Sequence, residues 1–337
     1  MQVDNPARAL WKIIVERAPI EAQLVVTRRC NLSCGYCTEF DNHSAELPLA
    51  SLKSSIDALH RLNVVYISLL GGEPLTHSRI DDVVAYASQG AAVSITTNGF
   101  LISDEIVDRL NASKLGNMQV SVDTMSSDPS RYIQKTMKTL LPKLQRLLSR
   151  ADFDVHVNVV LCDSSRGEFK AFIAALTDLG LRVTVNLLHD SRGAVQISGR
   201  DYMELWDHHY TSGNPLSHAE RSYGRALLAG ERPGWRCRAG SRYLYVDEYG
   251  NAQFCSAQRG RLEKAIAEYT VNDLREHAKS HKGCESGCAV FCVYRASQID
   301  NDPLTALVSL ARSVRSGAVK IRPARPLMPP AVLPRAK

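Results

Sequence analysis

The sequence predicts an α/β fold: a partial (β/α)6 barrel of parallel strands, followed by a small cysteine-rich α+β module. Two observations lead to this prediction. Apolar runs and longer helical patterns alternate through residues 22–190, as they do in sheets built from strand–helix repeats. In addition, the nine cysteines are not spread evenly, because all except Cys162 fall into one N-terminal and one C-terminal group.

The expected strands are short and rich in Val, Ile and Leu. They have little polar alternation, which is typical of parallel strands covered on both faces. They span residues 23–27, 64–70, 92–96, 118–122, 154–161 and 182–187. The helical patterns between and after them include residues 49–62, 78–89, 103–111, 136–150 and 168–179. Because the chemistry of parallel α/β folds lies at the carboxyl ends of the strands, residues directly after each strand are the first candidates for a site.

The pattern changes after Asp190. A helix is expected around Trp206. The adjacent His208 and His209 could ligate a metal ion, but neighbouring helical positions point about 100° apart, so a solvent-exposed pair is expected instead. A hairpin is expected from residues 243–246 and 252–255. The predicted division of the chain is an N-terminal extension (1–21), the barrel (22–190), a connector (191–235), the cysteine-rich module (236–302) and a basic, proline-rich tail (303–337).

The composition is that of a globular protein, with 45% hydrophobic and 23% charged residues, which excludes collagen-like and wholly disordered chains. No apolar run is long enough to span a membrane and no signal peptide is recognisable, so we expect a cytoplasmic protein. The net charge of +6 lies in the tail, which has seven basic and no acidic residues. Since the rest of the chain is nearly neutral, we expect no nucleic-acid partner.

In a reducing cytosol, clustered cysteines indicate metal or redox chemistry rather than disulfides. Cys30, Cys34 and Cys37 form a C-x3-C-x2-C array in the loop after the first strand. Three thiolates are one fewer than a four-iron cluster needs, so one iron would be left open to another ligand. The alternative is a zinc site completed by a remote histidine such as His43.

The array resembles the signature of the radical S-adenosylmethionine (SAM) superfamily, because an aromatic residue, Tyr36, directly precedes the third cysteine. Three further motifs in register reinforce the resemblance over residues 20–190. They are Gly71-Gly72-Glu73-Pro74, Thr97-Asn98-Gly99 and Ser121-Val122-Asp123. The resemblance implies that the three cysteines hold a 4Fe-4S cluster that binds and reductively cleaves SAM. The 5′-deoxyadenosyl radical so formed would abstract hydrogen from a substrate, with flavodoxin or ferredoxin as the electron donor.

The resemblance also implies contacts to the SAM cofactor. Tyr36 would lie beside adenine, and Gly71, Gly72 and Glu73 would receive the ammonium group, although a GGEP sequence alone also fits a simple tight turn. The ribose or carboxylate contacts would come from polar residues at the strand ends, namely Thr97, Asn98, Ser121 and Asn158. Candidates for the cation that binds the carboxylate are Arg131, Lys135 and Lys138.

The C-terminal cysteines resemble the SPASM and twitch modules of some radical enzymes. Cys237 and Cys255 flank the expected hairpin, and Cys284, Cys288 and Cys292 follow at spacings of four residues. A full SPASM module would have seven cysteines for two clusters, so five indicate one auxiliary 4Fe-4S cluster, held by four of the five. The firmest ligands are Cys237 and Cys255. A structural zinc site built from the same thiolates is the alternative.

The sequence therefore predicts a radical SAM enzyme acting on a peptide or a small molecule. About twenty residues precede the first strand, too few for the leader-recognition domain that peptide-modifying relatives often carry, so a peptide would be recognised in trans. The alternative is a noncatalytic iron–sulfur or zinc protein with a structural or sensing role. Substrate identity is not encoded in these motifs, because they initiate radical chemistry that the cofactor then carries.

Overall fold

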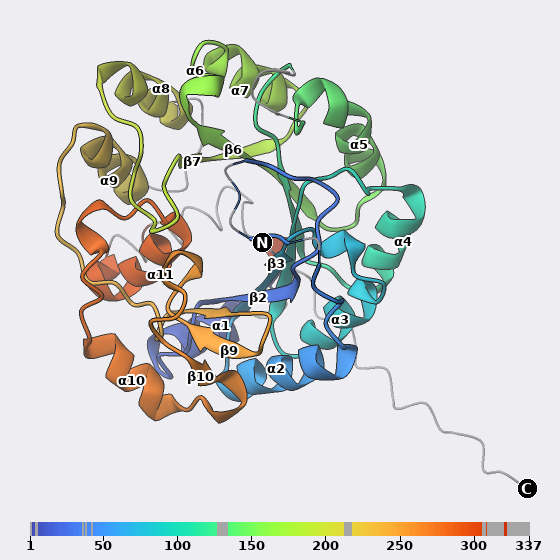
Figure 1. Cartoon of the computed structure of the whole chain (residues 1–337), viewed down its shortest axis with the longest axis vertical. Coiled ribbons are helices and arrows are strands. Elements are labelled where there is room, and N and C mark those ends of the chain that lie inside the picture. Colours follow the sequence, from blue (N-terminus) through green and yellow to red (C-terminus); the bar gives the residue numbers. More distant parts are fainter. Residues whose placement is uncertain are drawn as a thin grey trace, which may run out of the picture.

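The computed structural model describes residues 2–3, 6–35, 37, 39–41, 43–126, 134–211, 218–304, 308 and 320–321. Nine of its strands form one sheet in the order β10-β9-β8-β2-β3-β4-β5-β6-β7. The sheet curves, and helices surround its outer face to form an incomplete barrel (Figure 1). None of the described helices is both long and apolar enough to cross a membrane.

The six strands predicted for the barrel are confirmed to within two residues at each end, and neighbouring ones pair in parallel. Their bounds are β2 (Glu21–Thr27), β3 (Tyr66–Gly71), β4 (Ala92–Thr97), β5 (Asn117–Ser121), β6 (Asp154–Leu161) and β7 (Arg182–Leu187). The helices that follow them are α2 (Leu49–Arg61), α3 (Ile80–Ala87), α4 (Asp104–Ala112), α5 (Met137–Arg150), α6 (Asp163–Arg166) and α7 (Phe169–Asp178). The predicted (β/α)6 order is therefore correct.

The core lies between the sheet and these helices. Alternate residues of each strand, such as Leu24, Ile67 and Val120, are fully buried against the apolar faces of the helices. Local sequence signals fix where the helices begin. The Ser103 hydroxyl accepts a hydrogen bond from the Ile106 amide at the start of α4, and Thr136 does the same for Thr139 at the start of α5.

The inner face of the sheet differs from the expectation. Coverage on both faces holds for β4, but β6 and β7 alternate between buried and half-buried residues. Four of the half-buried positions carry polar side chains on this inner face, namely His156, Asn158, Thr184 and Asn186. This wall is polar because it borders the space that the barrel encloses, not a second layer of helices.

The C-terminal third continues the same sheet. Strand β8 (Tyr243–Val246) pairs in parallel with β2, then in antiparallel with β9 (Asn251–Gln253), which pairs with β10 (Lys264–Ala265). The predicted hairpin is thus present, and it extends the barrel by three strands beside β2. The remaining elements are α1 (Pro6–Ile14), α8 (Arg200–Thr211), α9 (His218–Leu228), α10 (Val271–Lys279), α11 (Phe291–Asn301) and a short parallel pair, β1 (Gln2–Val3) with β11 (Lys320–Ile321).

The prediction that His208 and His209 are both solvent-exposed is wrong for His209. Only 3% of His209 is exposed, and its ring lies edge-on to that of Tyr210. The reason is that α8 is covered on one side by α7 and on another by α9, so its exposed stripe is narrow. Burial lowers the pKa of His209 to about 4.

We predict that His209 makes the protein less stable in mild acid. Its pKa is lower in the folded state than in the unfolded chain, so between about pH 6.5 and pH 4 the unfolded chain binds the extra proton. The free energy of unfolding should therefore fall across this window, by up to about 3 kcal/mol from this residue. His209→Phe should reduce that loss in urea titrations at several pH values, whereas His281→Phe, at an exposed position, should not. An unchanged pH dependence in His209→Phe would contradict the assignment.

Candidate active site

The predicted site residues meet at one edge of the sheet. The cysteine loop follows β2, the Gly71–Gly72 turn ends β3, and Thr97 and Asn98 end β4. Because β2, β3 and β4 are parallel neighbours, their carboxyl ends lie next to one another. Tyr36 and Arg131 lie outside the described residues.

The two glycines allow the β3 turn to approach the cysteine loop. Gly71 has a φ of +139°, and a Cβ built on it would lie 2.0 Å from the Thr27 carbonyl oxygen. A Cβ on Gly72 would lie 2.2 Å from the Arg29 carbonyl oxygen. The backbone amides of Gly72 and Glu73 donate to those same two carbonyls, at 2.9 and 2.8 Å. Only glycine permits this contact between the two loops.

Glu73 is fully buried at the centre of the site. One carboxylate oxygen accepts hydrogen bonds from the Leu75 amide at 3.0 Å and the Thr97 hydroxyl at 2.8 Å. The other oxygen accepts from the Asn98 amide at 2.7 Å. Burial raises the pKa of Glu73, and these hydrogen bonds together with nearby Lys135 oppose the rise. The carboxylate therefore fixes the β4 turn to the β3 turn.

Asn98 connects the hydrogen bonds of Glu73 to the cysteine loop. Its side-chain amide donates to the Asn31 side-chain oxygen at 2.8 Å and to the Cys30 sulfur at 3.7 Å. The backbone amides of Leu32 and Glu39 donate to the sulfurs of Cys30 and Cys37, each at 3.4 Å. Burial raises the pKa of both thiols, and these N–H groups oppose that shift by stabilising the thiolates.

The three thiols are close enough to interact electrostatically. Within the described part of the chain, no group of three or more His, Cys, Asp or Glu side chains has the arrangement of a single-ion site. Cysteines of a four-iron cluster bind different iron atoms and so do not need that arrangement. Three soft thiolate donors, each half-buried and two of them receiving N–H groups, fit an iron–sulfur cluster.

Lys135 is the cation that the structure brings to this site. The residue is 8% exposed, its amine lies 3.3 Å from an Asp123 carboxylate oxygen, and its charge acts on both Glu73 and Cys37. Its backbone carbonyl also accepts from the Asp123 amide at 2.7 Å, which ties it to the end of β5. Lys138, by contrast, is exposed on α5.

The other predicted contacts lie on the inner wall. Ser121 of β5 is paired in register with Asn158 of β6. The Asn158 side-chain oxygen accepts from the Asn186 amide at 2.6 Å and the Thr184 hydroxyl at 3.2 Å. Thr184 and Asn186 were missed at the sequence level, although their alternation with Val183 and Val185 was a signal for them.

The C-terminal cysteines gather in a second place. Cys237, Cys255 and Cys288 are buried in one apolar group that includes Tyr243 and Tyr245, and Cys292 packs against it. Burial raises the pKa of Cys237 to about 11, and that of Cys288 and Cys292 to about 12. Cys284 lies outside the apolar group but acts electrostatically on Cys237 and Cys288. Thiols held this deep fit a metal centre better than a solvent-facing reactive site.

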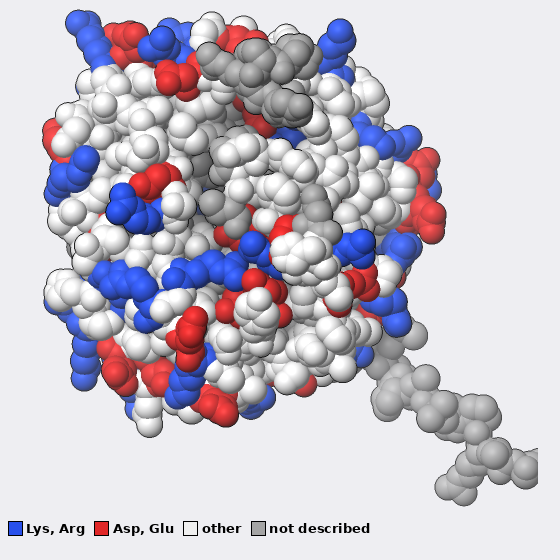
Figure 2. Space-filling model, in the orientation of Figure 1, with Lys and Arg blue, Asp and Glu red and all other residues white. Residues whose placement is uncertain are grey.

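Ion pairs join the cysteine loop to the hairpin. Arg28 lies 3.6 Å from Glu39 and 3.8 Å from Glu248, which belongs to the turn between β8 and β9. The Tyr245 hydroxyl donates to Glu39 at 2.6 Å, and Arg259 pairs with Glu248 at 2.5 Å. Basic and acidic side chains are also adjacent across the lower half of the face shown in Figure 2. The two cysteine groups thus belong to one connected structure.

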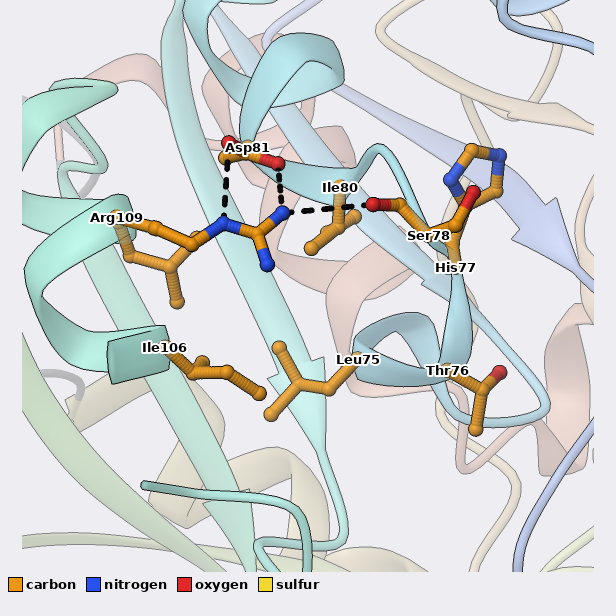
Figure 3. Close-up of a pocket in the computed structure, with 9 residues that line it drawn as sticks. Leu75, Thr76, His77, Ser78, Ile80, Asp81, Ile106 and Arg109 are labelled. Carbon is orange, nitrogen blue, oxygen red and sulfur yellow. Dashed lines mark hydrogen bonds and ion pairs between the residues drawn. The ribbon is translucent and has the colours of Figure 1, made fainter. Parts of the chain in front are cut away.

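A small cavity of about 110 Å³ lies on the outer side of the β3 turn and does not belong to this site. Figure 3 shows Leu75 and Ile106 facing one another across it, with Arg109 held by Asp81. No cysteine lines it. The cavity lies between the segment of residues 75–81 and α4.

Comparison with known proteins identifies the family of the chain. The radical SAM superfamily profile matches residues 24–189, which include the cysteine loop, the Glu73 turn and the β4 turn. The chain belongs to the radical SAM superfamily. It is a radical SAM enzyme, and membership implies a 4Fe-4S cluster and SAM as its cofactors.

Curated relatives cover more than the barrel. The mycofactocin maturase MftC of Mycobacterium ulcerans (strain Agy99) is 25% identical over 255 residues, covering 71% of this chain and 68% of the relative. The corresponding match to MftC of Mycobacterium tuberculosis (strain H37Rv) covers 64% of the relative. A probable GTP 3′,8-cyclase of Aeropyrum pernix is 28% identical over 250 residues, covering 70% of this chain and 68% of the relative.

Solved structures share the fold. Streptococcus suis SuiB bound to its precursor peptide SuiA has a TM-score of 0.58 at 16% identity, covering 85% of this chain and 74% of SuiB. The structure of anSMEcpe with bound AdoMet and the Kp18Cys peptide has a TM-score of 0.55 at 13% identity, covering 89% of this chain and 97% of that one. These likenesses extend past residue 190, so the C-terminal third is part of the shared fold.

We predict that Gly71→Ala strongly destabilises the protein, because the new Cβ would clash with the Thr27 carbonyl at a φ that L-residues rarely adopt. The free energy of unfolding should fall by about 3 kcal/mol or more. Gly167→Ala is the control, because no atom lies within 4 Å of its Cβ position, and it should change stability by no more than about 0.5 kcal/mol. Equal effects of the two substitutions in urea denaturation would show that the close approach at Gly71 is unimportant.

Proposed function

We propose that this enzyme modifies a peptide by radical chemistry started at the Cys30, Cys34 and Cys37 site. One observation carries the proposal. The cysteine loop, the Glu73 carboxylate and the Asn98 amide form one hydrogen-bonded unit at the carboxyl edge of the barrel. The peptide class is supported by the relatives, since MftC is named as a maturase and SuiB was solved with a precursor peptide.

Different residues of the chain would bind the cluster and the parts of SAM. Cys30, Cys34 and Cys37 would hold a 4Fe-4S cluster, which when bound and reduced supplies the electron that cleaves SAM. The turn at Gly71, Gly72 and Glu73 would receive the ammonium group of SAM through its backbone carbonyls, because the Glu73 carboxylate is already used by three donors.

The remaining cofactor contacts would come from the neighbouring strands. Thr97 and Asn98 would keep the β4 turn in place, and Ser121 and Asn158 would face the ribose from the inner wall. Tyr36 would lie beside adenine. Lys135, buried beside Cys37 and Glu73, would bind the carboxylate of SAM.

We further propose one auxiliary 4Fe-4S cluster in the C-terminal third. Cys237, Cys255, Cys288 and Cys292 are its favoured ligands, because they share one apolar surrounding that Cys284 does not. Cys284 is the alternative to one of them. Four protein thiolates would leave no open iron, which favours a role in electron transfer or structure over direct substrate binding.

Substitution of one cysteine in each group should distinguish the roles of the two proposed clusters. Cys34→Ala protein, reconstituted anaerobically and reduced with dithionite, should release no 5′-deoxyadenosine from SAM, while keeping about four irons per chain in the second site. Cys255→Ala should keep cleaving SAM but lose iron. A wild-type protein that contains zinc in the second site, measured by elemental analysis and Mössbauer spectroscopy, would contradict the auxiliary cluster.

A separate experiment with candidate substrates tests the proposal that a peptide is modified. Reduced enzyme with SAM is offered short peptides encoded in neighbouring genes and, separately, GTP, since one relative is named as a probable GTP 3′,8-cyclase. Mass spectrometry should show a mass change in a peptide. Consumption of GTP with every peptide unchanged would contradict the proposal.

We predict that Lys135→Met weakens SAM binding about tenfold or more, because a charge-assisted hydrogen bond contributes roughly 1.5–3 kcal/mol. Lys138→Met removes the same charge from an exposed position on the following helix and should change the dissociation constant less than twofold. Binding is measured by equilibrium dialysis with the reconstituted proteins. Lys135→Arg should restore part of the affinity. Similar affinities in Lys135→Met and wild type would exclude the proposed role.

A further inference from the structure

A second cavity lies at the opposite end of the barrel from the cysteine loop. Its volume is about 420 Å³, within the range of small-molecule sites. Ala18, Asn63 and Arg242, which line it, each precede one of the parallel strands β2, β3 and β8. The cavity is therefore at the amino ends of these strands, and α10 and the end of α11 line its other side.

The lining of this cavity is strongly basic. Seven of the described lining residues are basic and two, Glu16 and Asp300, are acidic. The basic residues are Arg17, Arg61, Arg236, Arg238, Arg242, Arg275 and Lys279. This local excess contrasts with the near-neutral charge of residues 1–302 as a whole.

Three of the arginines have structural partners. Arg61 donates to the Ala267 carbonyl oxygen at 2.8 Å. Arg242 donates to the carbonyl oxygens of Ile13 and Ala18 at 2.8 and 3.0 Å and to Asp300 at 2.8 Å, which fixes the end of α1. Arg238 lies 3.3 Å from the same Asp300 and donates to the Ala278 carbonyl. Asp300 is thus shared between two guanidinium groups and cannot neutralise the others.

Four other cations of the lining are in no ion pair within the described part of the chain. Arg17, Arg236, Arg275 and Lys279 are exposed and make no ion pair with another described residue. Burial lowers the pKa of Arg238; the charges of Arg236, Arg242 and Arg17 lower it further, and Asp300 raises it. Like charges so close repel one another, and an anion between them would relieve that repulsion.

The cavity also has an apolar wall formed by Val15, Leu62, Val271 and Leu274. Val15 and Val271 are 55% and 47% exposed. Sites for small organic ligands combine apolar surface with convergent polar groups, and this cavity offers both. Guanidinium groups favour phosphate and carboxylate groups, which they bind in a bidentate manner.

We propose that this basic cavity binds a small organic polyanion that carries phosphate or carboxylate groups, separately from the radical site. The ligand enters between α10 and the segment before β8, where Arg236, Arg275 and Lys279 reach it. Arg238 and Arg242 keep their contacts to Asp300 and to backbone carbonyls, and they add to the positive electrostatic potential of the cavity. The proposal does not depend on the peptide substrate, since the two sites lie at opposite ends of the strands.

Two probes test the site and distinguish the anion type. Inorganic tripolyphosphate and citrate are titrated by isothermal calorimetry into the full-length reconstituted protein at low ionic strength. We expect one equivalent of at least one probe to bind, with affinity falling as salt is added. The probe that binds more tightly identifies phosphate or carboxylate as the preferred group.

Matched variants locate the binding. Arg275→Ser/Lys279→Ser removes two exposed cations from the cavity and should weaken binding tenfold or more. Arg200→Ser/Lys170→Ser removes two exposed cations from α8 and α7 and should weaken it less than twofold. Both variants should keep the wild-type melting temperature and release of 5′-deoxyadenosine. Binding of neither probe, or equal weakening in the two double variants, would overturn the proposal.

Discussion

The buried carboxylate of Glu73 is the constraint on which the site depends. It sits at the junction of three parallel strands and accepts hydrogen bonds from the β3 and β4 turns. A fully buried carboxylate is costly unless such donors surround it, so its presence requires both turns to keep their positions. Asn98, held by this carboxylate through its backbone, then reaches the cysteine loop with its side chain. The geometry of the thiols is thereby set by the sheet, not by the loop alone.

The sheet also determines where the second group of cysteines lies. Because β8 pairs in parallel with β2, the hairpin flanked by Cys237 and Cys255 lies beside the strand whose end carries the first cysteines. Arg28 and Glu39, which flank the cysteine loop, make ion pairs and a hydrogen bond to Glu248, Arg259 and Tyr245. Movement of the hairpin would therefore act directly on the cysteine loop.

The local features were predictable from the sequence, and the long-range ones were not. Apolar runs such as 154–161 identify strands because a parallel strand must bury its outer face whatever its partners are. The pairing of β8 with β2 joins residues more than two hundred positions apart, and no local pattern encodes it. Similarly, Lys135 was one of three candidate cations, and only the fold places it beside Glu73 and Cys37. Ser121 and Asn158 of the polar inner wall were predicted because they lie at or beside strand ends, whereas Thr184 and Asn186 lie within an otherwise apolar strand and were missed.

The central claim is that three thiolates leave one iron open for SAM. Electron–nuclear double resonance on the reduced protein tests it most directly, with SAM carrying ¹⁵N in its amino group. The account predicts a hyperfine coupling from that nitrogen to the cluster, which Cys34→Ala protein lacks. A reduced cluster whose spectrum is unchanged by SAM, with no ¹⁵N coupling, would contradict it.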